Sequence, residues 1–151
     1  KLAPSVERYT ATDVSPGMIE IALERKAEAG DRIVDFLVAE ASDPILETGA
    51  WDAVLAFSLL HLVPEPAAAL RRIHDLLRPG GVFITKTPCL GRVSPYWPFV
   101  KVMQAVGKAP PVHFLGVRQF HAMIADAGFE IVETGSYPKR MNAFVVARKA
   151  S

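Results

Sequence analysis

The segment from Arg8 to Met18 places a carboxylate where a ligand can be bound. Residues 9–12 favour a β-strand that ends on Asp13, and Ser15 followed by Pro16 is typical of a helix N-terminus. A carboxylate at the carboxyl end of a parallel strand faces the crevice where α/β sheets bind ligands. Asp13 can accept two hydrogen bonds from a ribose diol there, which indicates a nucleotide-like ligand. The simpler interpretation is an Asp that begins an Asx turn.

The four histidines are the other candidates for chemistry. His61 follows an apolar segment at the expected tip of a strand, where an imidazole can act as a base near neutral pH. The alternative is a structural histidine bonded to backbone. His113 and His121 flank a variable region, and His74 is expected on the surface of an outer helix. No pair has the spacing of a metal site, so no metal is predicted.

Composition limits the classes of function. The chain has 151 residues, of which 50% are hydrophobic and 22% are charged, and this favours one globular domain over residues 1–151. The 17 basic and 16 acidic residues are well mixed and give a net charge of +1. No basic stripe is present, so neither nucleic acid nor an anionic membrane is an indicated partner. The longest apolar run, residues 53–63, is too short for stable membrane insertion.

Cys89 is the single cysteine of the chain. One thiol cannot form an internal disulfide, so a reducing, cytoplasmic setting is expected. The opening residues KLAPSVERYT lack the apolar core of a signal peptide.

Strand-like and helix-like segments alternate, which predicts a mostly parallel sheet with helices on its faces. The tetrapeptide Arg78–Gly81, RPGG, is expected to end the second helix. The short segment between the last two strands predicts an antiparallel hairpin. Strands are expected at 9–13, 34–39, 51–57, 82–86, 129–134 and 143–148. Helices are expected at 16–29, between Pro66 and the RPGG segment, and at about 117–127.

The chain contains, in this order, the runs TATDVSPGMIEIA, LVAEASDP, WDAVLAFSLLHLV, AALRRIHDLLRPGG and VFITKTP, followed by AGFEIVETGSYP and FVVARK. Together these runs resemble the class I S-adenosylmethionine-dependent methyltransferases, especially the small-molecule branch of the ubiquinone and menaquinone biosynthesis type. The resemblance covers Tyr9 to Lys149. It implies an α/β Rossmann-like sheet with strand order 3-2-1-4-5-7-6, in which only the seventh strand is antiparallel.

The resemblance also implies site residues and S-adenosylmethionine as the cofactor. Asp13 would bind the ribose hydroxyls and Val14 would pack on the adenine. Glu40 stands where the family usually has Asp, and would accept from the adenine amino group, although a solvated strand-end residue is an equal alternative. Further positions implied are Ala41 at the adenine edge, Phe57 and Ser58 beside the methionine part, and His61 with Leu62 toward the substrate.

The segment Pro88 to Gly116 is rich in proline and aromatic residues, and is expected to be a variable insertion on the substrate side. Tyr96 and Trp97, together with His113, are the expected substrate residues, because large aromatic side chains can line a flat apolar pocket. The alternative is that the aromatic residues form the core of the inserted segment.

One departure from the family pattern is large. The family begins with a strand and a glycine-rich loop of the kind DxGxGxG, and neither stands before Asp13 in this sequence. We therefore expect an N-terminally truncated enzyme in which the strands near Tyr9 and Val54 lack a partner. The loop lets backbone approach the cofactor closely, so we expect the 151-residue chain alone to bind S-adenosylmethionine poorly.

Methyl transfer to a small molecule is the leading functional hypothesis. A nicotinamide-dependent Rossmann oxidoreductase is a second, because an acidic residue also binds ribose in that class. A non-catalytic, methyltransferase-like partner or regulatory domain is a third. Oxygen, nitrogen and carbon acceptors all stay open. Unpaired strand edges favour a homodimer.

Overall fold

The computed structural model describes residues 6–30, 33–89, 113, 115–136 and 142–150. The chain divides into two units, residues 1–46 and residues 47–151, and each is compact by itself. That residues 1–151 form a single domain stays a prediction. Most of the expected insertion at residues 88–116 lies outside the described residues.

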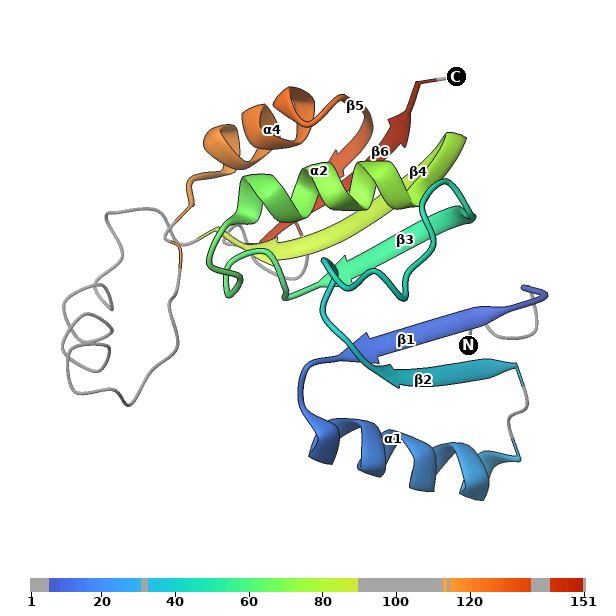
Figure 1. Ribbon diagram of the computed structural model, residues 1–151. Coiled ribbons are helices and arrows are strands. Elements are labelled where there is room, and N and C mark those ends of the chain that lie inside the picture. The colour runs from blue at the N-terminus through green and yellow to red at the C-terminus, as the bar shows by residue number, and fades with distance from the viewer. Residues whose placement is uncertain (1–5, 31–32, 90–112, 114, 137–141, 151) are drawn as a thin grey trace, which may run out of the picture. The chain divides into compact units, whose positions relative to one another are not determined.

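The first unit consists of two parallel strands joined by a helix (Figure 1). Strand β1, Tyr9–Asp13, pairs in parallel with β2, Val34–Val38. Helix α1, Pro16–Ala29, connects them and has the bounds expected from its sequence. Ser15 caps its start by accepting from the backbone N–H of Met18, and Gly30 ends it in the left-handed conformation at φ 65°.

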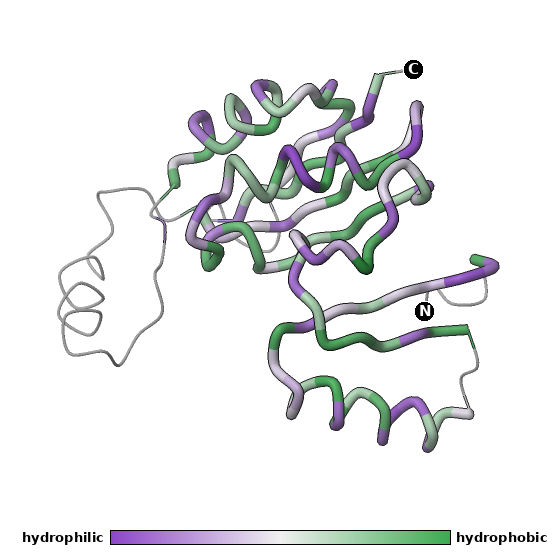
Figure 2. Tube along the Cα trace, viewed as in Figure 1, coloured by the Kyte–Doolittle hydropathy of each residue, from purple (hydrophilic) through white to green (hydrophobic). Residues whose placement is uncertain are grey.

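The apolar residues of α1 are only partly buried. Ile19 is the buried residue of the helix, whereas Met18 and Leu23 are 53% and 48% exposed. Figure 2 shows apolar and polar residues alternating along the helix. Lys26 lies against the sheet, because its ammonium donates to the backbone carbonyl of Val34. Two strands offer too narrow a surface to cover the whole apolar stripe.

The second unit is a four-stranded sheet in the order β3-β4-β6-β5 (Figure 1). Strand β3 runs parallel to β4, and β6 is antiparallel to both of its neighbours, β4 and β5. Helices α2 and α4 lie side by side on one face of this sheet. The bounds are β3 Trp51–Phe57, α2 Pro66–Leu76, β4 Leu77–Pro88, α4 Val117–Asp126, β5 Phe129–Gly135 and β6 Asn142–Lys149.

The strand orders agree with the expected topology. If the first strand is left out of the order 3-2-1-4-5-7-6, the remainder is 3-2 and 4-5-7-6, and these are the two orders observed. The antiparallel last strand is confirmed. Among the described residues, β1 pairs only with β2, and β3 pairs only with β4, so the unpartnered edges expected near Tyr9 and Val54 are present.

Two expectations about the second unit were wrong. The nearly all-apolar sequence of Trp51–Phe57 is typical of a central strand covered on both sides, but Asp52 and Ala53 are exposed and only Ala56 is buried, because β3 is an edge strand of the described sheet. The second helix ends at Leu76, just before the RPGG segment, as expected, but the next strand was expected to start only after this segment, at residue 82. Instead β4 begins at Leu77, which pairs with Trp51, and the register then shifts so that Ala53 pairs with Val82. The four residues of RPGG therefore lie inside β4, at an irregularity in its pairing with β3.

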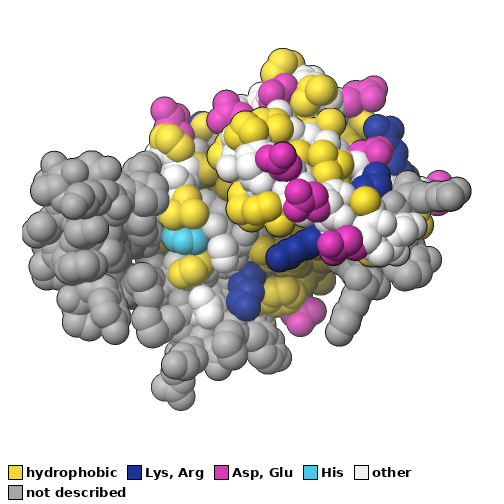
Figure 3. Space-filling model, turned by 90° about the horizontal axis from the view of Figure 1, so that it is seen from below, with side chains coloured by type: hydrophobic (Ala, Val, Ile, Leu, Met, Phe, Trp, Pro, Cys, Tyr) yellow, Lys and Arg dark blue, Asp and Glu magenta, His cyan; other side chains and the backbone are white. Residues whose placement is uncertain are grey.

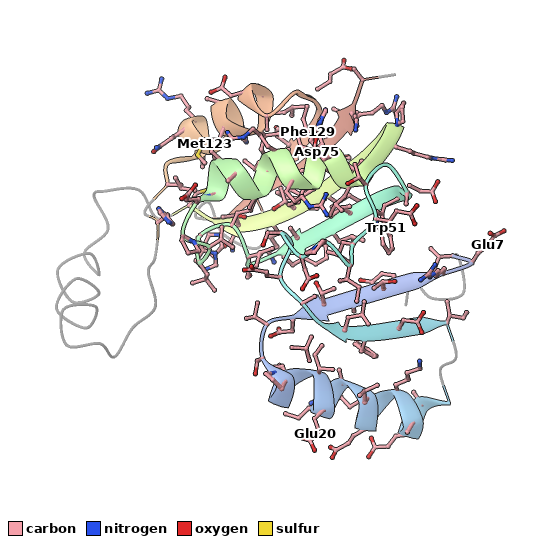
Figure 4. All side chains as sticks on the ribbon, viewed as in Figure 1. Glu7, Glu20, Trp51, Asp75, Met123 and Phe129 are labelled. Carbon is pink, nitrogen blue, oxygen red and sulfur yellow. The ribbon has the colours of Figure 1, made fainter. Side chains whose placement is uncertain are left out.

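The core of the second unit lies between the sheet and its two helices. Phe83 is fully buried, and its ring centroid lies 5.2 Å from that of Phe129. The ring of His74 on α2 is nearly perpendicular to that of Phe129, with ring centroids 5.1 Å apart (Phe129 is labelled in Figure 4). Thr85 is buried, and its hydroxyl is hydrogen-bonded, because Oγ1 donates to the carbonyl of Ala56 at 2.8 Å.

Gly128, before β5, provides a test of this packing. Its φ is +93°, and an added Cβ would lie 3.1 Å from Nε2 of His74. Gly49 also has a positive φ, +70°, but a Cβ there would meet nothing within 4 Å. We expect Gly49→Ala to lower the free energy of unfolding by about 1 kcal/mol, from backbone strain alone. Gly128→Ala should cost about 3 kcal/mol, because crowding adds to the strain. Urea denaturation measures both, and equal losses would show that the His74 contact is unimportant.

Candidate functional site

Asp13 is held in place by a turn at the carboxyl end of β1. Its Oδ1 accepts the backbone N–H of Ser15 at 2.8 Å, so the Asx turn expected as the simpler interpretation is present. Its other carboxylate oxygen makes no hydrogen bond to any described residue. The turn therefore orients the side chain and leaves acceptor capacity for a ligand, and the two interpretations of Asp13 are compatible.

Four predicted cofactor residues lie at the carboxyl ends of the two paired strands β1 and β2. The backbone N–H of Ala39 donates to the carbonyl of Asp13 at 3.1 Å, so the two strand ends are directly joined. Glu40 follows and is exposed, and Ala41 is half-buried. Val14 is 69% exposed although it is apolar. A carboxylate, an apolar side chain and a second carboxylate thus stand at the carboxyl ends of two paired parallel strands, where α/β folds bind ligands.

These residues suit the nucleoside part of S-adenosylmethionine. The oriented carboxylate of Asp13 offers acceptors for a ribose diol, and Val14 offers an exposed apolar surface for an adenine ring. Glu40 offers an acceptor for an exocyclic amino group. The ligand contact of each residue stays a prediction. The structure places these chemically suitable residues at the carboxyl ends of β1 and β2 in the first unit.

The remaining predicted cofactor residues lie at the tip of β3 in the second unit. Phe57 ends the strand and is 55% exposed. Ser58 adopts φ +54°, and its backbone N–H donates to the carbonyl of Lys86 at 2.8 Å. A non-glycine residue in the left-handed region is strained, and such strain is concentrated at functional sites. The sequence carries no signal for this conformation, since serine has no particular preference for it.

His61 and His113 are brought together. The backbone N–H of His113 donates to the carbonyl of His61 at 2.8 Å. This bond involves only the two backbones, and Nδ1 of the His61 ring is buried without a hydrogen-bond partner among the described residues, so both interpretations of the His61 side chain stay predictions. Burial lowers the pKa of the His61 imidazole from its ordinary value. The other two expected substrate residues, Tyr96 and Trp97, lie outside the described residues.

The lowered pKa of His61 predicts how stability depends on pH. The unfolded state takes up a proton on this histidine below about pH 6.5, while the folded state resists protonation until a lower pH. Stability should therefore fall as the pH drops from 6.5 toward the folded-state pKa, and the His61→Gln variant should show a smaller fall. Urea midpoints at pH 7.5 and pH 5.5 measure the difference. An identical fall in both proteins would contradict the prediction.

Charges of both signs are scattered over the molecular face shown in Figure 3, without a patch of one sign. This agrees with the mixed charge of the sequence. Within the described residues, no helix combines the length and hydrophobicity needed to cross a membrane.

Comparison with known proteins identifies the family. The profile described as "Methyltransferase domain" matches residues 1–83 of this chain. The highly reducing polyketide synthase easB of Emericella nidulans is 37% identical over 83 residues, which are 52% of this chain and 3% of that protein. The chain thus spans only a few per cent of the length of the curated relatives it matches.

Two solved structures show the fold. The [4+2]-cyclase SpnF matches with a TM-score of 0.80 at 20% identity, over 99% of this chain and 68% of that one. The CurJ carbon methyltransferase matches with a TM-score of 0.75 at 20% identity, over 99% of this chain and 44% of that one. Neither these proteins nor the matched family supports the nicotinamide oxidoreductase hypothesis. The chain belongs to the methyltransferase domain family, with the Rossmann-like fold of the enzymes that use S-adenosylmethionine as methyl donor.

Proposed function

We propose that the protein transfers a methyl group from S-adenosylmethionine to a carbon atom of a small keto-acyl substrate. The observation that carries the donor half of the proposal is the oriented carboxylate of Asp13, beside the exposed side chain of Val14. S-Adenosylmethionine supplies an electrophilic methyl group when it is bound. The chain's own residues then bind and align the two reactants, which is the main requirement of an in-line displacement.

Each predicted site residue has a defined task in this proposal. Asp13 accepts the ribose hydroxyls, Val14 packs against the adenine, and Glu40 accepts the adenine amino group, with Ala41 at the ring edge. At the tip of β3, Phe57 and Ser58 adjoin the methionine part. The last two residues belong to the second unit, and their assignment rests on the family resemblance together with the strained backbone of Ser58.

The proposed acceptor is supported by the relatives. One is a polyketide synthase, and one fold neighbour is a carbon methyltransferase. The carbon between the two carbonyl groups of a 3-oxoacyl thioester is acidic. A base can remove its proton and make it a nucleophile. Tyr96 and Trp97 stay the predicted lining of an acceptor pocket.

A methylation assay on the full protein tests the proposal. It should methylate a 3-oxoacyl thioester when isotopically labelled S-adenosylmethionine is supplied, and mass spectrometry should place the label on the carbon between the carbonyl groups. The matched control is the saturated acyl thioester of equal length, whose corresponding carbon is far less acidic. Label on oxygen, or no transfer with either compound, would overturn the carbon-acceptor proposal.

A second candidate is a role without methyl transfer. SpnF, a [4+2]-cyclase, shares the fold, so the fold alone does not require a methylation reaction. A protein that binds S-adenosylmethionine without consuming it, in the presence of all acceptors tested, would favour this candidate.

Homodimer formation and a cytoplasmic location are also proposed. The unpartnered edges of β1 and β3 support self-association, because an open edge presents free backbone hydrogen-bonding groups. Sedimentation analysis of the full protein tests it. The buried free thiol of Cys89 is consistent with a reducing compartment.

A further inference from the structure

Lys86 is a lysine inside β4 whose neighbours on the same face of the strand are apolar. Phe83 and Thr85 are fully buried on the face of the sheet that the helices cover. Because side chains alternate along a strand, Lys86 lies on the opposite face, where its neighbours along β4 are Ile84 and Pro88. Lysine is depleted in strands, so a lysine at this position calls for an explanation.

Strand pairing places an aromatic residue on each side of Lys86. Its partners in register are Phe57 of β3 and Phe144 of β6. Directly paired residues carry their side chains on the same face of a sheet, as neighbours. Lys86 is half-buried, and its ammonium forms no ion pair or hydrogen bond with any described residue. Removing an ammonium in part from water without a counter-charge is unfavourable, so this position favours a ligand that brings negative charge.

The backbone around Lys86 is fixed at a place suited to ligand binding. Lys86 stands near the carboxyl ends of the parallel strands β3 and β4, where α/β folds bind ligands. Its carbonyl accepts the backbone N–H of Ser58 at 2.8 Å, and the preceding Thr85 donates from Oγ1 to the carbonyl of Ala56 at 2.8 Å. Ser58 has φ +54°, a strained conformation of the kind that is concentrated at functional sites. The tip of β3 is thus held against Lys86.

We propose that Lys86 binds and stabilises the enolate oxygen of the carbon acceptor, an inference that rests on the proposed function. The carbon between the two carbonyl groups loses its proton to water, and the C–H electron pair moves through the adjacent carbonyl group to leave the negative charge on its oxygen. The Lys86 ammonium donates an N–H to this oxyanion and keeps its own proton. A fixed charge in apolar surroundings stabilises an oxyanion more than water does, so the enolate becomes a larger fraction of the bound acceptor.

The enolate fraction of a bound acceptor tests this site without the methyl donor. S-Acetoacetyl-N-acetylcysteamine is mixed with an excess of the full protein at neutral pH, and the near-ultraviolet absorption of the enolate is recorded. The wild type should raise the ratio of enolate to keto form above that in buffer. Lys86→Met keeps the apolar stem and removes the charge. It should lower the ratio by about 10-fold to 100-fold, as expected for loss of one hydrogen bond to a charged group.

Three further variants separate the charge from its surroundings. Lys86→Arg keeps a cation and should retain most of the wild-type ratio. Arg148→Met removes a cation from the same face of the sheet near the other end of β4, where Arg148 pairs with Val82, and should leave the ratio unchanged. Lys86→Gln takes the place of Lys86→Met if urea denaturation shows that the Met variant does not fold.

The outcomes distinguish this site from a structural or cofactor-binding lysine. A wild-type ratio in a folded Lys86→Met or Lys86→Gln protein would overturn the proposal, as would equal losses in Lys86→Met and Arg148→Met. Weaker binding of S-adenosylhomocysteine by Lys86→Met with an unchanged ratio would assign the lysine to the cofactor and also overturn it. Carbon methylation by Lys86→Met at the wild-type rate would overturn this inference and leave the proposed function standing. A Lys86-dependent enolate without any methyl transfer would instead overturn the proposed function and leave this site standing.

Discussion

Asp13→Asn is expected to weaken binding of S-adenosylhomocysteine by the full protein about 100-fold while leaving its stability nearly unchanged. Asparagine keeps the oxygen that accepts the Ser15 N–H, so the Asx turn at the start of α1 survives. It lacks the charge and the second carboxylate oxygen that would accept from the ribose. Hydrogen bonds to charged groups are worth about 1.5–3 kcal/mol each, and a loss of about 3 kcal/mol corresponds to about 100-fold in Kd.

Asp13→Ala is the matched comparison for this prediction. It removes the turn as well as the ligand contact, so it should lower both the free energy of unfolding and the affinity. Equilibrium dialysis with labelled ligand gives the affinities, and urea denaturation gives the stabilities. If the Asn variant binds as tightly as the wild type, Asp13 is a turn residue only.

Phe83→Ala is expected to cost about 3–5 kcal/mol of unfolding free energy, the range for truncating a fully buried phenylalanine. Phe83 is 0% exposed in the middle of β4, and its ring lies 5.2 Å from Phe129. The substitution leaves a cavity and removes an aromatic pair. Because domains are stable by only about 5–15 kcal/mol, this single change should remove a large part of the total stability.

Two substitutions control for this effect. Phe83→Leu keeps most of the apolar volume and should cost about 1.5 kcal/mol or less. Phe57→Ala makes the same truncation at a 55% exposed position, so it should change stability little, and its effect should be on cofactor affinity. Urea denaturation of the three variants measures the ranking. Equal losses for Phe83→Ala and Phe57→Ala would mean that the described core is wrong.

Local signals in the sequence predicted α1 and its flanks well. Ser15, Pro16 and Gly30 each have a conformational preference that suits one position only, and the helix begins and ends where they indicate. The register of β1 against β2 then places Asp13 at the strand end beside Ala39. The first-unit part of the candidate site could therefore be predicted in outline, because its residues lie close to strand ends.

Features that depend on distant parts of the chain were not predictable in the same way. The RPGG segment contains the strongest breaking residues of the sequence, yet pairing of Leu77 with Trp51 extends β4 through it. The exposure of Leu23 depends on how much sheet α1 covers, which no local pattern encodes. The bond between His113 and His61 joins two loops, and the left-handed Ser58 lies in the connection from β3 to α2, where its N–H bonds to β4. Each of these is decided by tertiary contacts.

Titration calorimetry of the full protein with S-adenosylhomocysteine tests the central claim most directly. Membership of the methyltransferase domain family and the geometry at Asp13 predict one binding site per chain, with binding lost in large part in the Asp13→Asn variant. Absence of binding by a folded, full-length protein would contradict the claim and leave a non-catalytic role for the fold.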